Sequence, residues 1–143
     1  MESMTPYGAA DGHSKDDAWK VSETEWGKDI QERTFQYALR IIGLYRYLKQ
    51  LRDDIGTIIG RQLLRAGTSV GANVSEARSA QSRADYAHKL SIALKEARES
   101  LYWIRLLTEA GVVDATRIGP LHKESDEIIA VLTTIVFKLK QKP

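Results

Sequence analysis

Hydrophobic residues recur every three or four positions along four long stretches of the chain, a spacing that predicts amphipathic helices. No stretch alternates between apolar and polar residues over a useful length, so no strand is expected. Long helices joined by short connections favour antiparallel neighbours, and the predicted fold class is an all-α, up-down-up-down four-helix bundle. The expected helices run from Ser22 or Lys28 to Leu51, from Ile55 to Ser79, from Ser82 to Ala110, and from between Asp114 and Pro120 to Lys140.

Residues at the expected helix ends support these boundaries. Ser82 is a good N-cap, and Asp85 favours the amides of the first turn. Gly111 follows the third helix, where a left-handed cap favours glycine. Pro120 is tolerated only near a helix start, which places it early in the fourth helix.

The first residues of the chain are polar and rich in Gly, Asp and Ser, which is typical of a flexible extension. Residues 1–28 are therefore expected to form an N-terminal extension, and residues 29–143 the bundle. Trp19 and Trp26 are unusual in such a segment. They either attach the extension to the bundle or form part of a partner-binding segment.

The second expected helix, from about Ile55 to Ser79, divides into three stripes when each residue is advanced by 100°. One stripe is apolar and is expected to face the core: Ile59, Leu63, Ala66, Val70, Val74 and Ala77. Beside it runs a stripe that we call the polar seam, made of Gln62, Arg65, Ser69, Asn73 and Glu76. Because the polar seam borders the core, it is expected to be at least half buried and to need hydrogen-bond partners. Those partners come from another helix, another subunit or a ligand, so the polar seam is either a structural network or a binding surface.

Two glycines on the third stripe need an explanation, because each costs about 1 kcal/mol relative to alanine inside a helix. Gly67, Gly71 and Ser75 repeat at four-residue spacing and leave a shallow groove that another backbone can approach. The groove serves either tight packing inside the bundle or a subunit contact.

The third expected helix is apolar on more than one side near its end. Leu101 and Ile104 belong to its core face, whereas four further residues are expected to point in other directions: Tyr102, Trp103, Leu106 and Leu107. A helix that is apolar nearly all round is buried nearly all round. We therefore expect another copy of the chain to cover these residues in a homo-oligomer. The alternative is that the N-terminal extension folds back over them.

Composition narrows the function further. Hydrophobic residues make up 43% of the chain and charged residues 28%, as in an ordinary globular protein, and the net charge of +2 gives no strong sign of nucleic-acid binding. The chain has no cysteine, which excludes disulfides and thiol chemistry. No apolar run approaches the roughly 18 residues of a membrane span, and the N-terminus does not resemble a secretory signal. A cytoplasmic protein with no membrane partner is expected.

Candidate catalytic or metal-binding groups are weak. The pair Asp85 and His88 only approximates the motif of a di-metal bundle, and His88 is expected to face away from the core. Glu96 and Glu99 are typical of a salt-bridged surface. We therefore expect no catalytic residue, no metal, no cofactor and no small-molecule substrate, and we interpret the protein as a non-enzyme.

Basic residues gather at three places along the chain and are the candidate RNA contacts. Cations at a helix C-terminus are also expected from the helix dipole alone. An oligomeric ring would repeat such a weak basic patch. The candidates are Arg46, Lys49, Arg52, Arg61, Lys138 and Lys140.

The second and third helices resemble those of the 23S rRNA intervening-sequence proteins. The motifs are QLLRAGTSVGANVSEA (62–77), AQS (80–82) and DYAHKLSIALKEARESLYWIRLL (85–107), with a looser match in ALRIIGLYRYLKQ (38–50). The resemblance covers roughly residues 30–140 and does not include the extension.

The resemblance implies an antiparallel four-helix bundle that assembles into a ring, typically a homopentamer, without enzyme activity and with an unknown physiological role. It also implies association with rRNA or the ribosome as an alternative role. A related bundle family assists the reverse transcriptase of diversity-generating retroelements. That family is strongly basic, and the near-neutral charge of this chain departs from it.

Overall fold

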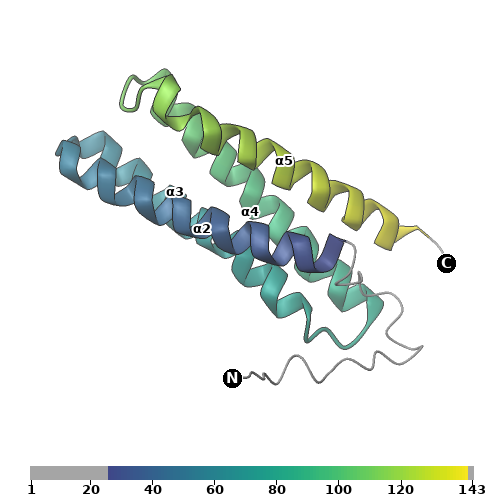
Figure 1. Ribbon diagram of the computed structural model, residues 1–143. Coiled ribbons are helices and arrows are strands. Elements are labelled where there is room, and N and C mark those ends of the chain that lie inside the picture. Colours follow the sequence, from purple (N-terminus) through teal and green to yellow (C-terminus); the bar gives the residue numbers. More distant parts are fainter. Residues whose placement is uncertain (1–25, 142–143) are drawn as a thin grey trace, which may run out of the picture.

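The computed structural model describes residues 26–141, and within them it contains four α-helices and no strand (Figure 1). The predictions about residues 1–25, including Trp19, and about the side chain of Trp26 lie outside the described part. The all-α bundle predicted from the sequence is confirmed. The helices are α2 (Trp26–Leu51), α3 (Asp54–Ala77), α4 (Arg83–Glu109) and α5 (Ala115–Lys140).

Each helix packs against two others in the order α2, α3, α4, α5, and the loosest contact closes the ring between α5 and α2 (Figure 1). Neighbouring helices run in opposite directions. Gly71, late in α3, faces Thr34, early in α2, whereas Gly60 faces Leu48 near the end of α2. This alternation is the predicted up-down-up-down arrangement.

The residues that end the helices act as their chemistry predicts. The Ser82 hydroxyl accepts a hydrogen bond from the Asp85 amide at 3.0 Å, and Asp53 caps α3 in the same way through the Gly56 amide at 3.0 Å. Gly111 has a φ of 75°, the left-handed conformation expected after α4.

The core follows the predicted stripe closely on α3. Leu63, Ala66, Val70, Val74 and Ala77 are buried, and only Ile59 is partly exposed. This burial sets the direction of the polar seam, which lies beside the core stripe and toward α4.

On α2 the apolar spacing predicts one core face, made of Ala38, Ile41, Ile42, Tyr45 and Leu48, and the observed core is rotated from it. Ile41 and Leu48 are buried as expected, but Ala38, Ile42 and Tyr45 are only half buried. The observed core instead includes a set of residues earlier on the helix: Ile30, Thr34 and Tyr37. Thr34 and Tyr37 carry hydroxyls, so a pattern of apolar spacing does not mark them as core residues.

Candidate functional site

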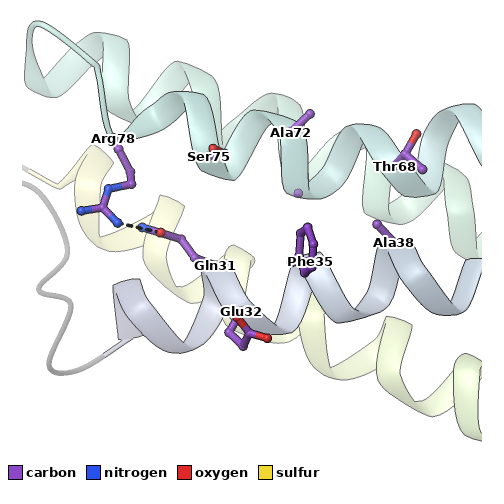
Figure 2. A pocket seen from close by; sticks show the side chains of 9 residues that line it. Gln31, Glu32, Phe35, Ala38, Thr68, Ala72, Ser75 and Arg78 are labelled. Carbon is purple, nitrogen blue, oxygen red and sulfur yellow. Dashed lines mark hydrogen bonds between the residues drawn. The ribbon is translucent and has the colours of Figure 1, made fainter. Parts of the chain in front are cut away.

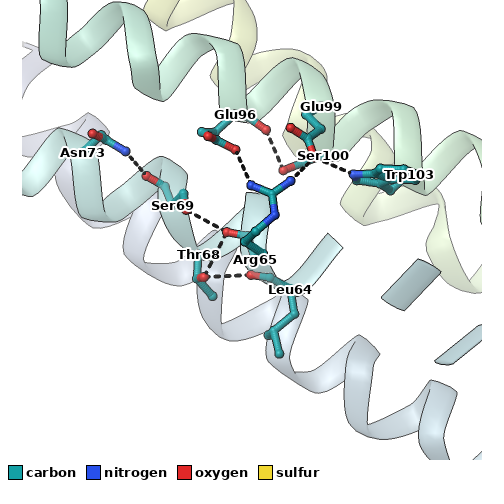
Figure 3. A network of polar contacts seen from close by, with 9 residues as sticks. All are labelled: Leu64, Arg65, Thr68, Ser69, Asn73, Glu96, Glu99, Ser100 and Trp103. Atoms are coloured by element: carbon teal, nitrogen blue, oxygen red, sulfur yellow. Dashed lines mark hydrogen bonds and ion pairs between the residues drawn. The ribbon is translucent and has the colours of Figure 1, made fainter. Parts of the chain in front are cut away.

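The polar seam of α3 forms a chain of hydrogen bonds along the outer side of the α3–α4 contact (Figure 3). The Ser69 hydroxyl donates to the Arg65 carbonyl at 2.8 Å, and the Asn73 amide donates to the Ser69 carbonyl at 2.9 Å. Glu76 forms a 3.3 Å ion pair with Lys89 of α4. Most of the polar partners of the polar seam are therefore found within α3 itself or on the adjacent helix of the same chain.

Arg65 connects the polar seam to α4. Its guanidinium lies 3.4 Å from a carboxylate oxygen of Glu96 and also pairs with Glu99. The same Glu99 carboxylate accepts a hydrogen bond from the Trp103 indole nitrogen at 3.0 Å (Figure 3). Glu96 and Glu99 of α4 thus both form ion pairs with Arg65 of α3, and the positive charge of Arg65 compensates their negative charges.

The polar seam is more exposed than predicted. The Arg65 side chain is 51% exposed and that of Glu76 is 64% exposed, so the expectation of at least half burial is wrong for these two residues. Long charged side chains lay their stems along the protein and extend their charged ends into water. Ser69 and Asn73, which are shorter, are partly buried as expected, and Gln62 is exposed.

Gly67 and Gly71 allow α2 to approach α3 closely. A Cβ atom at Gly67 would lie 2.8 Å from Cγ1 of Ile41, and one at Gly71 would lie 3.1 Å from the carbonyl oxygen of Thr34. The structure therefore gives both glycines a packing role inside the chain. Their contact with another subunit stays a prediction, and only Gly71 is partly exposed.

The apolar end of α4 is divided between core and surface. Leu107 is fully buried, so the prediction that it points away from the core is wrong. It lies three residues after Ile104, a step that changes the direction on a helix by only about 60°. The turn after α4 also folds over it, because the amides of Val112 and Val113 both bond to its carbonyl.

Tyr102, Trp103 and Leu106 remain at the surface. Tyr102 is 55% exposed, and its ring meets that of Trp103 edge-on with the centroids 5.0 Å apart. Trp103 and Leu106 are half buried. We call these residues, together with the exposed Ile55 and Ile58 of α3, the α3–α4 apolar face. The two isoleucines were not predicted, because they lie in the direction of the polar seam, a side of α3 that is otherwise polar.

The structure separates the candidate RNA contacts into two groups. Arg46, Lys49, Arg52 and Arg61 lie around the turn from α2 to α3, and Lys49 stands over the Tyr45 ring at 5.8 Å. Lys138 and Lys140 lie at the end of α5, beside the beginning of α2. Helices of this length separate the two groups by roughly 30 Å or more. The six residues therefore do not form one patch.

A groove with a volume of about 650 Å³ lies between α2 and α3, and it includes Gly71 and Ser75 of the groove predicted from the sequence. Small residues form its α3 side: Thr68, Gly71, Ala72 and Ser75. Figure 2 shows the Phe35 ring pointing from α2 toward α3 inside this groove. Phe35 is 58% exposed. We call this feature the α2–α3 groove.

The centre of the bundle contains a buried tyrosine that the sequence did not suggest. The Tyr37 hydroxyl lies 2.6 Å from the hydroxyl of Ser125 on α5, and both residues are fully buried. Ser125 also donates to the Leu121 carbonyl at 3.0 Å. Burial raises the pKa of the Tyr37 phenol above its ordinary value, although its hydrogen bonds with Ser125 and Ser100 oppose the shift.

The contact between α2 and α5 is strengthened by ion pairs. Arg33 lies 3.2 Å from Glu124 and 2.7 Å from Glu127, and Arg40 lies 3.5 Å from Glu124. Burial disfavours the charge of Arg33, but the two carboxylates outweigh this effect and raise its pKa. These pairs hold together the loosest of the four helix contacts.

Residues 26–141 contain no group of three or more His, Asp or Glu side chains placed to hold a metal ion. None of their helices is both long and apolar enough to cross a membrane. His88 is exposed on α4, as predicted.

The model of the 23S rRNA-intervening sequence protein family matches residues 28–134, which span the polar seam, the α3–α4 apolar face and the α2–α3 groove. This chain belongs to that family. A solved structure of a protein of unknown function from the S23 ribosomal protein family of Bacteroides thetaiotaomicron VPI-5482 is 37% identical to it, with a TM-score of 0.73. The match covers 78% of this chain and 97% of the other. No curated protein matches the sequence.

Proposed function

We propose that this family member is a non-enzymatic homo-oligomer, and that the α3–α4 apolar face makes the contact between subunits. The observation that carries the proposal is the cluster of exposed apolar side chains on that face. Ile55, Ile58 and Tyr102 are each between 55% and 58% exposed. Large contiguous exposed apolar surfaces commonly mark interaction sites.

The cluster is continuous across two helices. Arg65 of α3 pairs with Glu99 of α4, which sets these two positions side by side. Ile58 lies seven residues before Arg65, and Leu106 lies seven residues after Glu99. Because α3 and α4 are antiparallel, both steps lead in the same direction along the bundle, so Ile58 and Leu106 also lie opposite each other. Tyr102 and Trp103 flank this pair. The surface therefore presents aromatic and branched apolar groups next to a paired charge, a composition typical of interface centres.

The number of subunits depends on which surface of the neighbouring subunit contacts the α3–α4 apolar face. A twofold dimer would use the same face on both subunits, whereas a closed ring needs a second, different surface. The family resemblance favours a ring, typically a pentamer. The ion pairing of Arg65 with Glu96 and Glu99 supports the non-enzymatic part of the proposal, because the most concentrated set of acidic and basic groups on this face is used to join helices.

Light scattering after size-exclusion chromatography tests the proposal directly. The full chain, with a subunit mass of 16.1 kDa, should elute at micromolar concentration with a mass that is a whole multiple of that value. Ile58→Glu and Tyr102→Glu should each lower the mass, because a charge in a desolvated contact is costly. Thr133→Glu adds the same charge at an exposed position of α5 and is the matched control. A monomeric wild-type chain would refute the proposal, as would equal masses for all three variants.

A second candidate function is RNA binding through the end of the bundle where α2 turns into α3. Arg46, Arg52 and Arg61 are exposed there, close to Lys49. Arg52 adopts a left-handed backbone with a φ of 55°, which places it at the tip of the turn. In a ring, every subunit would repeat this small basic group. Such repetition is what a role in association with rRNA, the ribosome or a retroelement would require.

Salt-dependent binding distinguishes this candidate. Fluorescence anisotropy with a labelled rRNA fragment should show binding at low salt that weakens steeply as salt rises, since phosphate contacts release counterions. The double variant Arg46→Gln/Arg61→Gln should reduce both the affinity and the salt slope. Lys138→Gln/Lys140→Gln removes the same charge from the opposite end of the bundle and should have little effect. Absence of binding at low salt would exclude this role.

A further inference from the structure

The charge of the chain is divided unequally between its two parts. Residues 1–25 contain six acidic and two basic residues, a net charge of −4, whereas residues 26–143 contain 13 acidic and 19 basic residues, a net charge of +6. The near-neutral total therefore hides an acidic segment attached to a basic bundle. Opposite charges on two connected parts of one chain favour their association.

The bundle also presents a groove that can receive a large apolar side chain. The α2–α3 groove has a floor of small residues on α3, and Phe35 on its α2 side is 58% exposed. One end of the groove is formed by Gln31 and Arg78, whose side chains hydrogen-bond at 2.8 Å (Figure 2). Gln31 lies only five residues after Trp26, where α2 begins. The groove therefore opens close to the point where residues 1–25 join the bundle.

We propose that the α2–α3 groove is the docking site for residues 1–25 of the same chain, with Trp19 packed beside Phe35. The reach of the segment permits this. Trp19 is seven residues before α2 and can extend by up to about 25 Å, whereas Phe35 lies about 14 Å along α2 from Trp26.

The acidic residues of the segment can approach the basic end of the same face. With Trp19 beside Phe35, at about 14 Å along α2, Asp16 can lie up to about 10 Å further on. Arg46 lies about 30 Å along that helix, so its long side chain has to span the remaining ~6 Å. Gly60 of α3 faces Tyr45 and Leu48, so Arg61 stands at the same level as Arg46. Docking would thus place two carboxylates near the cations that are the candidate RNA contacts.

For binding to the α2–α3 groove, the segment of the same chain has a concentration advantage over a separate partner. A covalent connection raises the effective concentration of a ligand to roughly the millimolar range for a short flexible linker. A second copy of the chain at micromolar concentration competes poorly for the same groove unless its contact is larger. We therefore assign the groove to the chain's own segment.

Disulfide exchange in the 143-residue chain can measure this docking, because the chain has no cysteine of its own. The double variant Ala18→Cys/Ala72→Cys places one thiol in the segment and one in the groove. The matched control is Ala18→Cys/Ala130→Cys, with the second thiol exposed on α5. Ala72 follows Gly71, which faces Thr34, and Ala130 is one turn beyond Glu127, which pairs with Arg33. The two positions therefore lie at similar levels along the bundle, on different faces.

The measured quantity is the effective concentration of each thiol pair in a glutathione redox buffer. The groove pair should form its intrachain disulfide with an effective concentration at least tenfold above that of the α5 pair. Adding Phe35→Ser should bring the groove pair to the control value, and Asp16→Asn/Asp17→Asn should lower it and weaken its salt dependence. Circular dichroism verifies that the variants remain helical.

Three results would overturn the proposal. Equal effective concentrations for the two pairs would show that the segment does not prefer the groove. Failure of the groove pair to form a disulfide would lead to the same conclusion. Mixing the two single-cysteine variants, Ala18→Cys and Ala72→Cys, reports interchain docking as a disulfide-linked dimer on a non-reducing gel. A dimer formed in preference to the intrachain disulfide would assign the groove to the segment of a second copy.

Discussion

The helix-to-helix approach at Gly67 leads to a quantitative prediction about stability. Replacing an exposed helical glycine by alanine stabilises a protein by about 1 kcal/mol, because the helix becomes intrinsically more favourable. Gly43 is such a position, since a Cβ atom there would meet nothing within 4 Å. Gly43→Ala should therefore raise the free energy of unfolding by about 1 kcal/mol.

Gly67→Ala gains the same favourable helix propensity, but its new Cβ atom clashes with α2. The new Cβ would lie 2.8 Å from Cγ1 of Ile41 and 3.1 Å from both Cδ1 and Cγ2, whereas carbon atoms pack best at about 3.5–4.0 Å. Ile41 is fully buried, and its branched side chain has few other rotamers. Overpacking of this kind costs about 1–3 kcal/mol, so we expect a net loss of about 1 kcal/mol. The two glycine variants should thus differ by about 2 kcal/mol.

Urea unfolding followed by circular dichroism measures both values. All variants must be compared at one protein concentration, because subunit association would add to the apparent stability. The double variant Gly67→Ala/Ile41→Val removes one of the three clashing carbons and should show a favourable coupling of about 0.5–1 kcal/mol. If Gly67→Ala stabilised the protein as much as Gly43→Ala, close packing against α2 would not be the reason for glycine at this position.

Two further predictions concern polar contacts. Tyr37→Phe removes the hydrogen bond with Ser125 and should cost about 1 kcal/mol at neutral pH, measured by the same unfolding assay. Because burial raises the pKa of Tyr37 in the folded state, the unfolded phenol ionises first as the pH rises through 10, and wild-type stability should fall there more steeply than that of Tyr37→Phe. Arg65→Met should cost at most about 1 kcal/mol, since its ion pairs are exposed. Arg65→Glu should cost more than Arg65→Met, because it faces Glu96 and Glu99, and equal losses would show that these pairs contribute no electrostatic stability.

The sequence predicted the helices and the orientation of α3 because an uninterrupted apolar stripe runs from Leu63 to Ala77. It failed on α2, where the core includes the hydroxyl groups of Thr34 and Tyr37. Those groups are satisfied by partners that a helical pattern does not reveal: the Thr34 hydroxyl donates to the Ile30 carbonyl at 2.8 Å, and that of Tyr37 meets Ser125. Burial of a polar residue depends on such partners, so periodicity alone could not place it.

The partners of the polar seam could have been found only in part. Glu96, Glu99 and Trp103 share one stripe of α4, so the spacing was sufficient to show that they face one direction. Which helix that stripe meets depends on the order of packing around the bundle, which the sequence does not determine. Only the α4 half of the α3–α4 apolar face was predicted. Its α4 residues form a dense apolar run, whereas Ile55 and Ile58 lie in the direction of the polar seam, whose other residues are polar.

The division of charge changes how nucleic-acid binding should be judged for this chain. A net charge of +2 argues against a basic surface only if the whole chain presents one average surface to its partners. A bundle carrying +6 attracts phosphate, and a covalently attached segment carrying −4 competes for the same cations. Docking of the segment beside Arg46 and Arg61 would weaken RNA binding without changing the bundle. The two proposals are therefore coupled. If both hold, Asp16→Asn/Asp17→Asn should strengthen RNA binding at low salt more than the charge-matched variant Glu2→Gln/Asp11→Asn does, and the two variants should have equal effects if the segment docks elsewhere.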